Sequence, residues 1–167
     1  DNRIVMTRDI AVSRGLLGGN TIERKQLVIS DGIPGQVTSL ALNRAGDALY
    51  AGTENGHLMV FRLDDQGNLA SRDAVAAFSD SRSVTALGMV FGDVSLAVGD
   101  SEGLVSTWSE VRTDESRTLT CIHELVWHRG PVTAILPSQR DQTLMSLGEG
   151  GDAHLDYVTS EKHLLAL

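Results

Sequence analysis

The sequence predicts an all-β protein built from three copies of one repeat. Each copy opens with a Val-Thr pair, has a glycine 15 or 16 residues after that valine, and has an aromatic residue nine positions after the glycine. The leading valines are 47 and 48 residues apart. A period of about 40–50 residues with short strands is typical of a β-propeller, with one four-stranded blade per copy. The anchors are Val37, Gly52 and Phe61, then Val84, Gly99 and Trp108, then Val132, Gly148 and Tyr157.

Two strands are predicted ahead of the first copy, at 3–12 and 21–29, because both segments are rich in β-branched residues. The segment between them contains Gly15, Gly18 and Gly19. These glycines lack the spacing of a dinucleotide-binding loop, and no helical pattern follows them. We therefore interpret this segment as a plain turn.

Each full copy then supplies four strands, separated by turn signals such as Gly46-Asp47 and Glu54-Asn55-Gly56. Gly and Asn favour such turns because they tolerate positive φ angles. The predicted strands are 36–42, 48–52, 57–62 and 69–78, then 84–91, 94–98, 104–109 and 117–127, then 132–136, 143–147, 153–158 and 162–167.

Two strands plus three sets of four predict a partial propeller of about 3.5 blades. Propellers usually close with about four to eight blades, and a repeat unit cannot bury its apolar faces alone. We therefore expect the ring to be completed from elsewhere, either by the parent protein or by a homodimer that closes a seven-bladed ring. The expected domain is 1–167, divided into a half blade at 1–30 and blades at 31–80, 81–128 and 129–167.

Composition narrows the function classes. The formal net charge of −8 argues against a broad nucleic-acid surface, which needs clustered positive charge. No apolar run approaches the roughly 20 residues that span a bilayer, and no secretory signal is visible. Asp1 is not an initiator methionine, which predicts a processed chain or a piece of a longer one. The single cysteine, Cys121, is expected to be a buried or half-buried apolar side chain. One thiol leaves both a periplasmic and a cytosolic location open.

One departure from the repeat is a candidate for chemistry. Asp152, His154 and Asp156 alternate along a predicted strand, so they share one face. Such a face can bind a divalent metal or supply an acid and a base. Aligned by glycine, His154 matches Leu58 and Val105, so a position that is apolar in two copies is polar in the third. The interpretation we favour is a face that is exposed or meets a polar partner.

No other catalytic set is indicated, and the sequence predicts no enzyme and no cofactor. There is no nucleophile elbow, and no Ser-His-Asp set can be assembled. The acidic pairs Asp64-Asp65 and Asp114-Glu115 lack the ligand spacing of a calcium loop and are predicted to be solvated. Arginines suit phosphate, but nothing indicates that those in or beside the loops converge, and the negative net charge disfavours anions. These arginines are Arg8, Arg14, Arg24 and Arg129.

Two segments carry a resemblance to WD40 repeats. Residues 128–134, His-Arg-Gly-Pro-Val-Thr-Ala, resemble the Gly-His-x-x-x-Val start of such a repeat, and residues 103–108 resemble its Gly-x-Val-x-x-Trp-Asp end. The resemblance is to degenerate copies, because Arg62, Ser109 and Val158 stand where the final Asp belongs. It implies a WD40-like or quinoprotein-like propeller of bacterial type, in which His128 forms a structural hydrogen bond within its blade. The recurring aromatic residues are expected to pack between blades.

A narrower resemblance joins residues 128–135 to the tail 150–165, Gly-Gly-Asp-Ala-His-Leu-Asp-Tyr-Val-Thr-Ser-Glu-Lys-His-Leu-Leu. Together they resemble the extracytoplasmic domain of proteobacterial phosphate ABC-transporter permeases. This implies a non-catalytic interaction or regulatory domain at the periplasmic face of the inner membrane. Its expected partners are the parent permease, which provides the only membrane attachment, and the substrate-binding protein. The alternatives are a cytoplasmic propeller scaffold for protein–protein interaction and, third, a metal-binding or enzymatic propeller.

Overall fold

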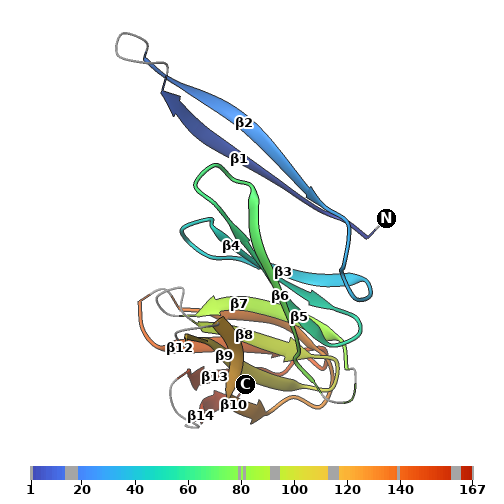
Figure 1. Cartoon of the computed structure of the whole chain (residues 1–167). Coiled ribbons are helices and arrows are strands. Elements are labelled where there is room, and N and C mark those ends of the chain that lie inside the picture. The colour runs from blue at the N-terminus through green and yellow to red at the C-terminus, as the bar shows by residue number, and fades with distance from the viewer. Residues whose placement is uncertain are drawn as a thin grey trace.

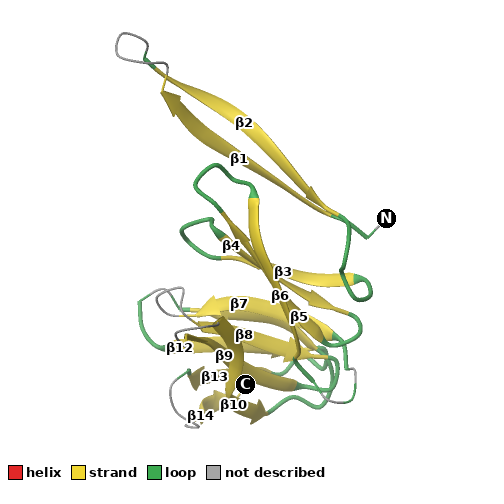
Figure 2. Cartoon of the chain, viewed as in Figure 1, coloured by secondary structure: helices red, strands yellow, loops and turns green. Residues whose placement is uncertain are grey.

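The structure, a computed structural model, contains only β-strands as regular elements in the part of the chain that it describes (Figure 2). Among these residues, no helix is long and apolar enough to cross a membrane. Arg14, Gly15, Gly18 and the pair Asp114-Glu115 lie outside the described residues, so the predictions made for them stay predictions. The described residues are 2–13, 19–78, 80, 82–90, 95–112, 117–138, 140–158 and 163–166, with the backbone alone at 20 and 163–166.

The strands form one hairpin and three antiparallel sheets of four strands each. The hairpin consists of β1 (Ile4–Ser13) and β2 (Asn20–Ile29). The first sheet contains β3 (Val37–Leu42), β4 (Ala48–Thr53), β5 (His57–Leu63) and β6 (Leu69–Ala76). The second contains β7 (Val84–Val90), β8 (Ser95–Asp100), β9 (Leu104–Arg112) and β10 (Arg117–Val126). The third contains β11 (Val132–Pro137), β12 (Thr143–Gly148), β13 (Ala153–Tyr157) and β14 (His163–Ala166).

The predicted strands are confirmed one for one. The largest difference is in β9, which was expected to end at 109 and continues to Arg112. Within each sheet the strands pair in chain order, so β3, β7 and β11 are the first strands of their sheets. β3 contacts β7, and β7 contacts β11, so neighbouring sheets meet along their first strands, as the blades of a propeller do. β3 and β7 can be followed in Figure 1.

The hydrophobic core lies between the sheets, because each sheet buries apolar side chains against its neighbours. Buried residues between the hairpin and the first sheet are Ile4, Ile29, Leu49, Ala51, Met59 and Phe61. Between the first and second sheets they include Tyr50, Leu58, Val60, Val84, Leu96, Val98 and Trp108. Between the second and third sheets they include Ala97, Val105, Leu125, Val132, Ile135 and Leu144.

The hairpin takes the place of the outer half of a further blade. It precedes β3 in the chain as β5 and β6 precede β7, and as β9 and β10 precede β11. Leu40 and Leu42 of β3 pair with Ala51 and Leu49, so they lie on the side of the first sheet that faces the hairpin. They are 51% and 49% exposed, because the hairpin supplies no strand opposite them.

This arrangement does not support the expected seven-bladed homodimer. Two copies would bring two outer halves, each packed against the first sheet of its own chain. The ring would then contain two hairpins at two separate places, and neither hairpin would supply the inner strands that the other lacks. A seventh blade needs one inner and one outer half at the same place.

The pairing of β11 with β12 corrects the expected position of the third glycine. In the first two copies, the leading valine pairs with the residue that follows the anchor glycine. In the third copy, Val132 pairs with Gly148 itself. Leu147, and not Gly148, therefore stands in the place of Gly52 and Gly99. The reason is the spacing of 16 instead of 15 residues, because a shift of one residue moves a strand residue to the other face.

The same shift corrects the expected role of Tyr157. Phe61 and Trp108 each pair with a buried leucine of the preceding strand. The equivalent leucine of the third sheet is Leu144, and its partner is Asp156. Asp156 is 1% exposed, whereas Tyr157 points to the other face and is 39% exposed. The prediction that Tyr157 packs between blades is therefore wrong.

Candidate functional site

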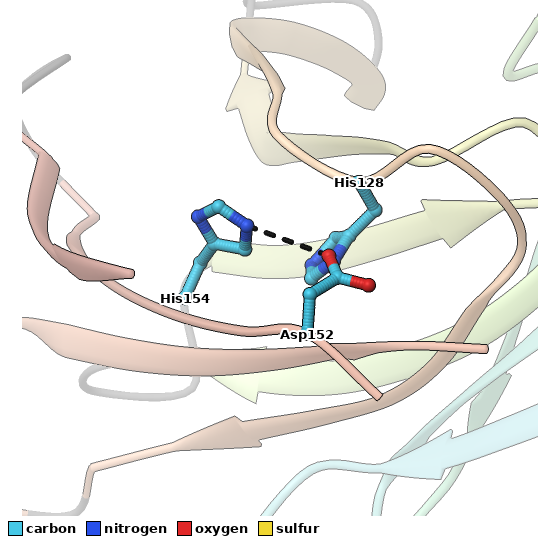
Figure 3. Close-up of side chains that lie close together, drawn as sticks. All are labelled: His128, Asp152 and His154. Carbon is cyan, nitrogen blue, oxygen red and sulfur yellow. Dashed lines mark hydrogen bonds and ion pairs between the residues drawn. The ribbon is translucent and has the colours of Figure 1, made fainter. Parts of the chain in front are cut away.

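A polar cluster lies where the third sheet begins, formed by three side chains from separate parts of the chain (Figure 3). His128 comes from the connection between β10 and β11, Asp152 from the turn between β12 and β13, and His154 from β13. One ligand atom from each residue lies within 4.8 Å of the other two. Both histidines are buried, and Asp152 is partly exposed.

His128 connects the cluster to the sheet through both of its ring nitrogens. Its Nδ1 forms a short hydrogen bond with Asp152 Oδ2, and its Nε2 lies 2.8 Å from Ser146 Oγ on β12. Asp152 Oδ2 also lies 3.5 Å from His154 Nε2. The expectation that His128 forms structural hydrogen bonds within its blade agrees with this geometry. One carboxylate oxygen therefore lies between two imidazole rings.

Aromatic contacts fix the two rings further. Trp127 stacks on His154 with ring centroids 5.8 Å apart, at an interplanar angle of 27°. The rings of His128 and His154 meet edge to face, with centroids 4.6 Å apart. The two imidazoles are thus held in one orientation by the residues around them.

Two glycines allow the turn to bring Asp152 to His128. Gly151 has a backbone φ of 84°, a conformation that residues with a side chain rarely adopt. The amide of Gly148 donates to the Asp152 carbonyl at 2.9 Å. A Cβ at Gly148 would lie 2.6 Å from Asp152 Oδ1 and 2.7 Å from His128 Nδ1. The glycine that breaks the repeat alignment therefore leaves room for the polar cluster.

The electrostatics of the cluster favour an ionised carboxylate. The hydrogen bond from His128 holds the pKa of the Asp152 carboxyl below its ordinary value, although partial desolvation raises it. An ionised carboxylate beside two imidazoles accepts hydrogen bonds from protonated ring nitrogens. The same three groups are typical ligands of a transition metal.

The structure brings together only part of the set expected from the sequence. Asp152 and His154 meet, and His128 joins them, whereas Asp156 lies further along β13 and is not one of the three clustered residues. The residues that are equivalent to His154 in the other two repeats also differ from those expected. His154 pairs with Ser146, which gives it the position of Met59 and Ser106 in the other sheets and not that of Leu58 and Val105.

A second feature, which the sequence did not indicate, is a recess between the first and second sheets. It has a volume of about 570 Å³, and its lining includes Tyr50, Arg62, Glu110, Arg112 and Arg117. Arg62 binds Glu110 at 2.6 Å across the two sheets, with side chains 16% and 13% exposed. The Tyr50 hydroxyl donates to the same carboxylate at 3.2 Å. Burial, with the charge of Glu110, raises the pKa of Tyr50 to about 12.

Of the arginines considered for phosphate, the three that the structure describes, Arg8, Arg24 and Arg129, do not form a common site. Arg8 and Arg24 belong to the hairpin, where Arg24 forms an exposed ion pair with Asp9 at 2.9 Å. Arg129 lies in the connection to the third sheet. The arginines that do share a recess are Arg62 of β5, Arg112 of β9 and Arg117 of β10, from strands of two sheets.

Comparisons with known proteins identify the fold. No family model matches the chain, and no curated protein matches it. Among solved structures, the chain resembles one described as the crystal structure of RRP9 WD40 repeats, with a TM-score of 0.64, 16% identity, and coverage of 81% of this chain and 39% of that chain. It also resembles the structure of U3-55K, with a TM-score of 0.65, 16% identity, and coverage of 81% and 40%. The chain spans about two fifths of either protein, and its fold is that of a partial WD40-like propeller.

Proposed function

We propose that the chain is a non-catalytic scaffold that docks another protein, and that an acidic segment of this partner enters the recess between the first and second sheets. The WD40-like fold supports a scaffold, because propellers present short loops on a rigid framework that suits protein docking. The observation that carries the proposal is a pair of exposed arginines, Arg112 and Arg117, in a recess of this chain, whose net charge is −8. With Arg62 set against Asp47 and Glu110, the lining keeps a net charge of +1.

The excess positive charge comes from two exposed arginines, which outweigh the exposed carboxylate of Asp47 in the same lining. Arg62 is already neutralised by Glu110, with which it forms the buried ion pair between the sheets. Arg112 and Arg117 face each other across β9 and β10, and neither forms an ion pair with a described residue. Arginine side chains bind carboxylates through two parallel hydrogen bonds, so this pair suits an acidic polypeptide.

The proposal is tested with a fluorescent poly-glutamate peptide and two charge reversals of equal size. Arg112→Glu places the change in the recess, and Arg140→Glu places it on an exposed turn of the third sheet. We expect salt-dependent binding that Arg112→Glu weakens at least about tenfold and Arg140→Glu leaves nearly unchanged. No binding by the native chain, or equal losses in both variants, would reject the recess as the docking position.

The narrower expectation, an extracytoplasmic domain of a phosphate-type ABC permease, rests on the resemblance of residues 128–135 and 150–165 alone. The comparisons support the general scaffold better, because the similar structures are WD40 proteins. The periplasmic location and the contact with a substrate-binding protein belong to this narrower proposal. Titration of the chain with a periplasmic phosphate-binding protein tests it, and saturable binding is the result it requires.

A further inference from the structure

We propose that His128, Asp152 and His154 form a binding site for one zinc ion. Two imidazole nitrogens and one carboxylate oxygen are a frequent protein ligand set for Zn²⁺, with a fourth position left for water. The three candidate ligand atoms all lie within 4.8 Å of one another. They come from a connection, a turn and a strand, so an ion at this place would join three separate segments.

The ligand spacing suits a tetrahedral ion. Ligands about 2.0–2.1 Å from a tetrahedral zinc lie about 3.3 Å from one another. His154 Nε2 and Asp152 Oδ2 already lie 3.5 Å apart. His128 Nδ1 is closer to the same oxygen, because the two atoms share a hydrogen bond. To admit the ion, this hydrogen bond must open while the remaining pair stays almost in place.

Ser146 supports the change of protonation that metal binding requires. An ion on Nδ1 of His128 needs the lone pair of that nitrogen, so the imidazole must carry its proton on Nε2. Nε2 lies 2.8 Å from Ser146 Oγ, and a hydroxyl can accept or donate. The ring can therefore hold either tautomer without losing this partner. Hydrogen bonds of this kind orient metal-binding histidines and fix their protonated nitrogen.

Burial distinguishes this cluster from an exposed group of polar side chains. His128 and His154 are buried between the second and third sheets, and Trp127 stacks on His154. The Asp152 side chain is 35% exposed, which gives the ion a route from solvent and leaves room for a water ligand. Side chains held this firmly lose little freedom on binding, which favours affinity.

A hydrogen-bond network of three side chains, His128, Asp152 and Ser146, needs no metal, and His154 is the fourth side chain at this place. The equivalents of His154 in the other two sheets are Met59 and Ser106, so the fold does not require histidine at this position. A metal ligand set gives the histidine on β13 a function that neither equivalent has.

Isothermal titration of the full chain with ZnCl₂, after treatment with EDTA, tests the proposal. We expect one ion per chain, an upward shift of the melting temperature, and release of protons that a change of buffer reveals. Co²⁺ bound in the same place is expected to give the visible absorption of a tetrahedral site. His154→Ser introduces serine, which is the residue at the equivalent position of the second sheet, Ser106. Asp152→Asn keeps the size of the side chain. Each should weaken zinc binding at least about tenfold.

His123→Ser is the matched control, because it removes a histidine of β10 that lies outside the cluster. It should bind zinc as the native chain does. Far-ultraviolet circular dichroism without metal checks that every variant is folded. The proposal is wrong if the native chain takes up no zinc, or if His154→Ser, still folded, binds zinc with native affinity. If both variants fail to fold, the cobalt spectrum of the native chain decides, and absorption without tetrahedral character rejects the site.

Discussion

The hydroxyl of Thr85 donates a hydrogen bond of 2.6 Å to the carbonyl of Val132, joining the first strand of the second sheet to the first strand of the third. Thr38 bonds the Val84 carbonyl in the same way, one sheet earlier. The Val-Thr pair that opens the second repeat therefore has two functions. In the second repeat, the carbonyl of Val84 accepts a bond from the preceding sheet, and the hydroxyl of Thr85 donates one to the following sheet.

Removing this bond should weaken the contact between the second and third sheets. We expect Thr85→Val, which keeps the shape of the side chain, to lower the free energy of unfolding by about 1 kcal/mol. Urea unfolding followed by circular dichroism measures the change. Thr133→Val is the control, because the Thr133 hydroxyl bonds Leu147 within its own sheet and its side chain is exposed. Equal losses in the two variants would contradict a special role for the contact between sheets.

Gly99 should be required for the same junction. A Cβ at Gly99 would lie 2.6 Å from the Cβ of Val132, which is fully buried. We expect Gly99→Ala to lower the free energy of unfolding by about 1–3 kcal/mol, because the two sheets must move apart. Gly130→Ala is the matched control, since a Cβ at Gly130 has no atom within 4 Å.

A double variant identifies the cause of this loss. If the collision with Val132 is responsible, Val132→Ala should cost less in the Gly99→Ala background than in the native chain. Strictly additive losses would show instead that Gly99→Ala acts through the conformation of its own strand. Both results come from the same urea unfolding curves.

The sequence predicted the strands well, because their limits are encoded locally. Turn residues such as Asn55-Gly56 and Gly46-Asp47 separate apolar segments, and the period of the leading valines follows from the repeated contact with the preceding glycine. The alignment of the third repeat failed at Gly148. A single additional residue is invisible to a pattern of anchors that tolerates it, yet it reverses which face each side chain occupies.

The candidate sites show a similar limit. Alternation along one strand indicated Asp152 and His154, because residues two apart share a face. His128 joins them from the connection before β11, and alternation along one strand does not indicate a contact with a residue 24 positions away. Only the resemblance to WD40 repeats assigned His128 a hydrogen bond within its blade. The recess had no local signal at all, because Arg62 lies on β5 of the first sheet while Arg112 and Arg117 lie on β9 and β10 of the second.

Cys121 should react slowly in the folded chain. Desolvation raises the pKa of its thiol, and the charge of Glu124 raises it further, so less thiolate is present near neutral pH. We expect iodoacetamide to modify the native chain at pH 8 more slowly than the urea-unfolded chain. Glu124→Gln should increase the native rate, while Glu149→Gln, in the turn after β12, should not. A native rate equal to that of the unfolded chain would contradict the raised pKa.

Tyr50 should make the junction of the first and second sheets sensitive to alkali. Its pKa is raised to about 12 in the folded chain, against about 10 when unfolded. Between these values the unfolded chain loses the phenolic proton first, so the folded state becomes less favoured as pH rises. The full effect of two pKa units is about 2–3 kcal/mol. Tyr50→Phe removes this titration and also the hydrogen bond to Glu110.

The variant should therefore be less stable than the native chain at pH 9, by about 1 kcal/mol. Its disadvantage should shrink as the pH rises to 11.5, because only the native chain then loses stability through Tyr50. The difference between the two unfolding free energies isolates this residue from the other groups that titrate in the same range. A difference that stays constant from pH 9 to 11.5 would show that the phenol of Tyr50 keeps its ordinary pKa in the folded chain.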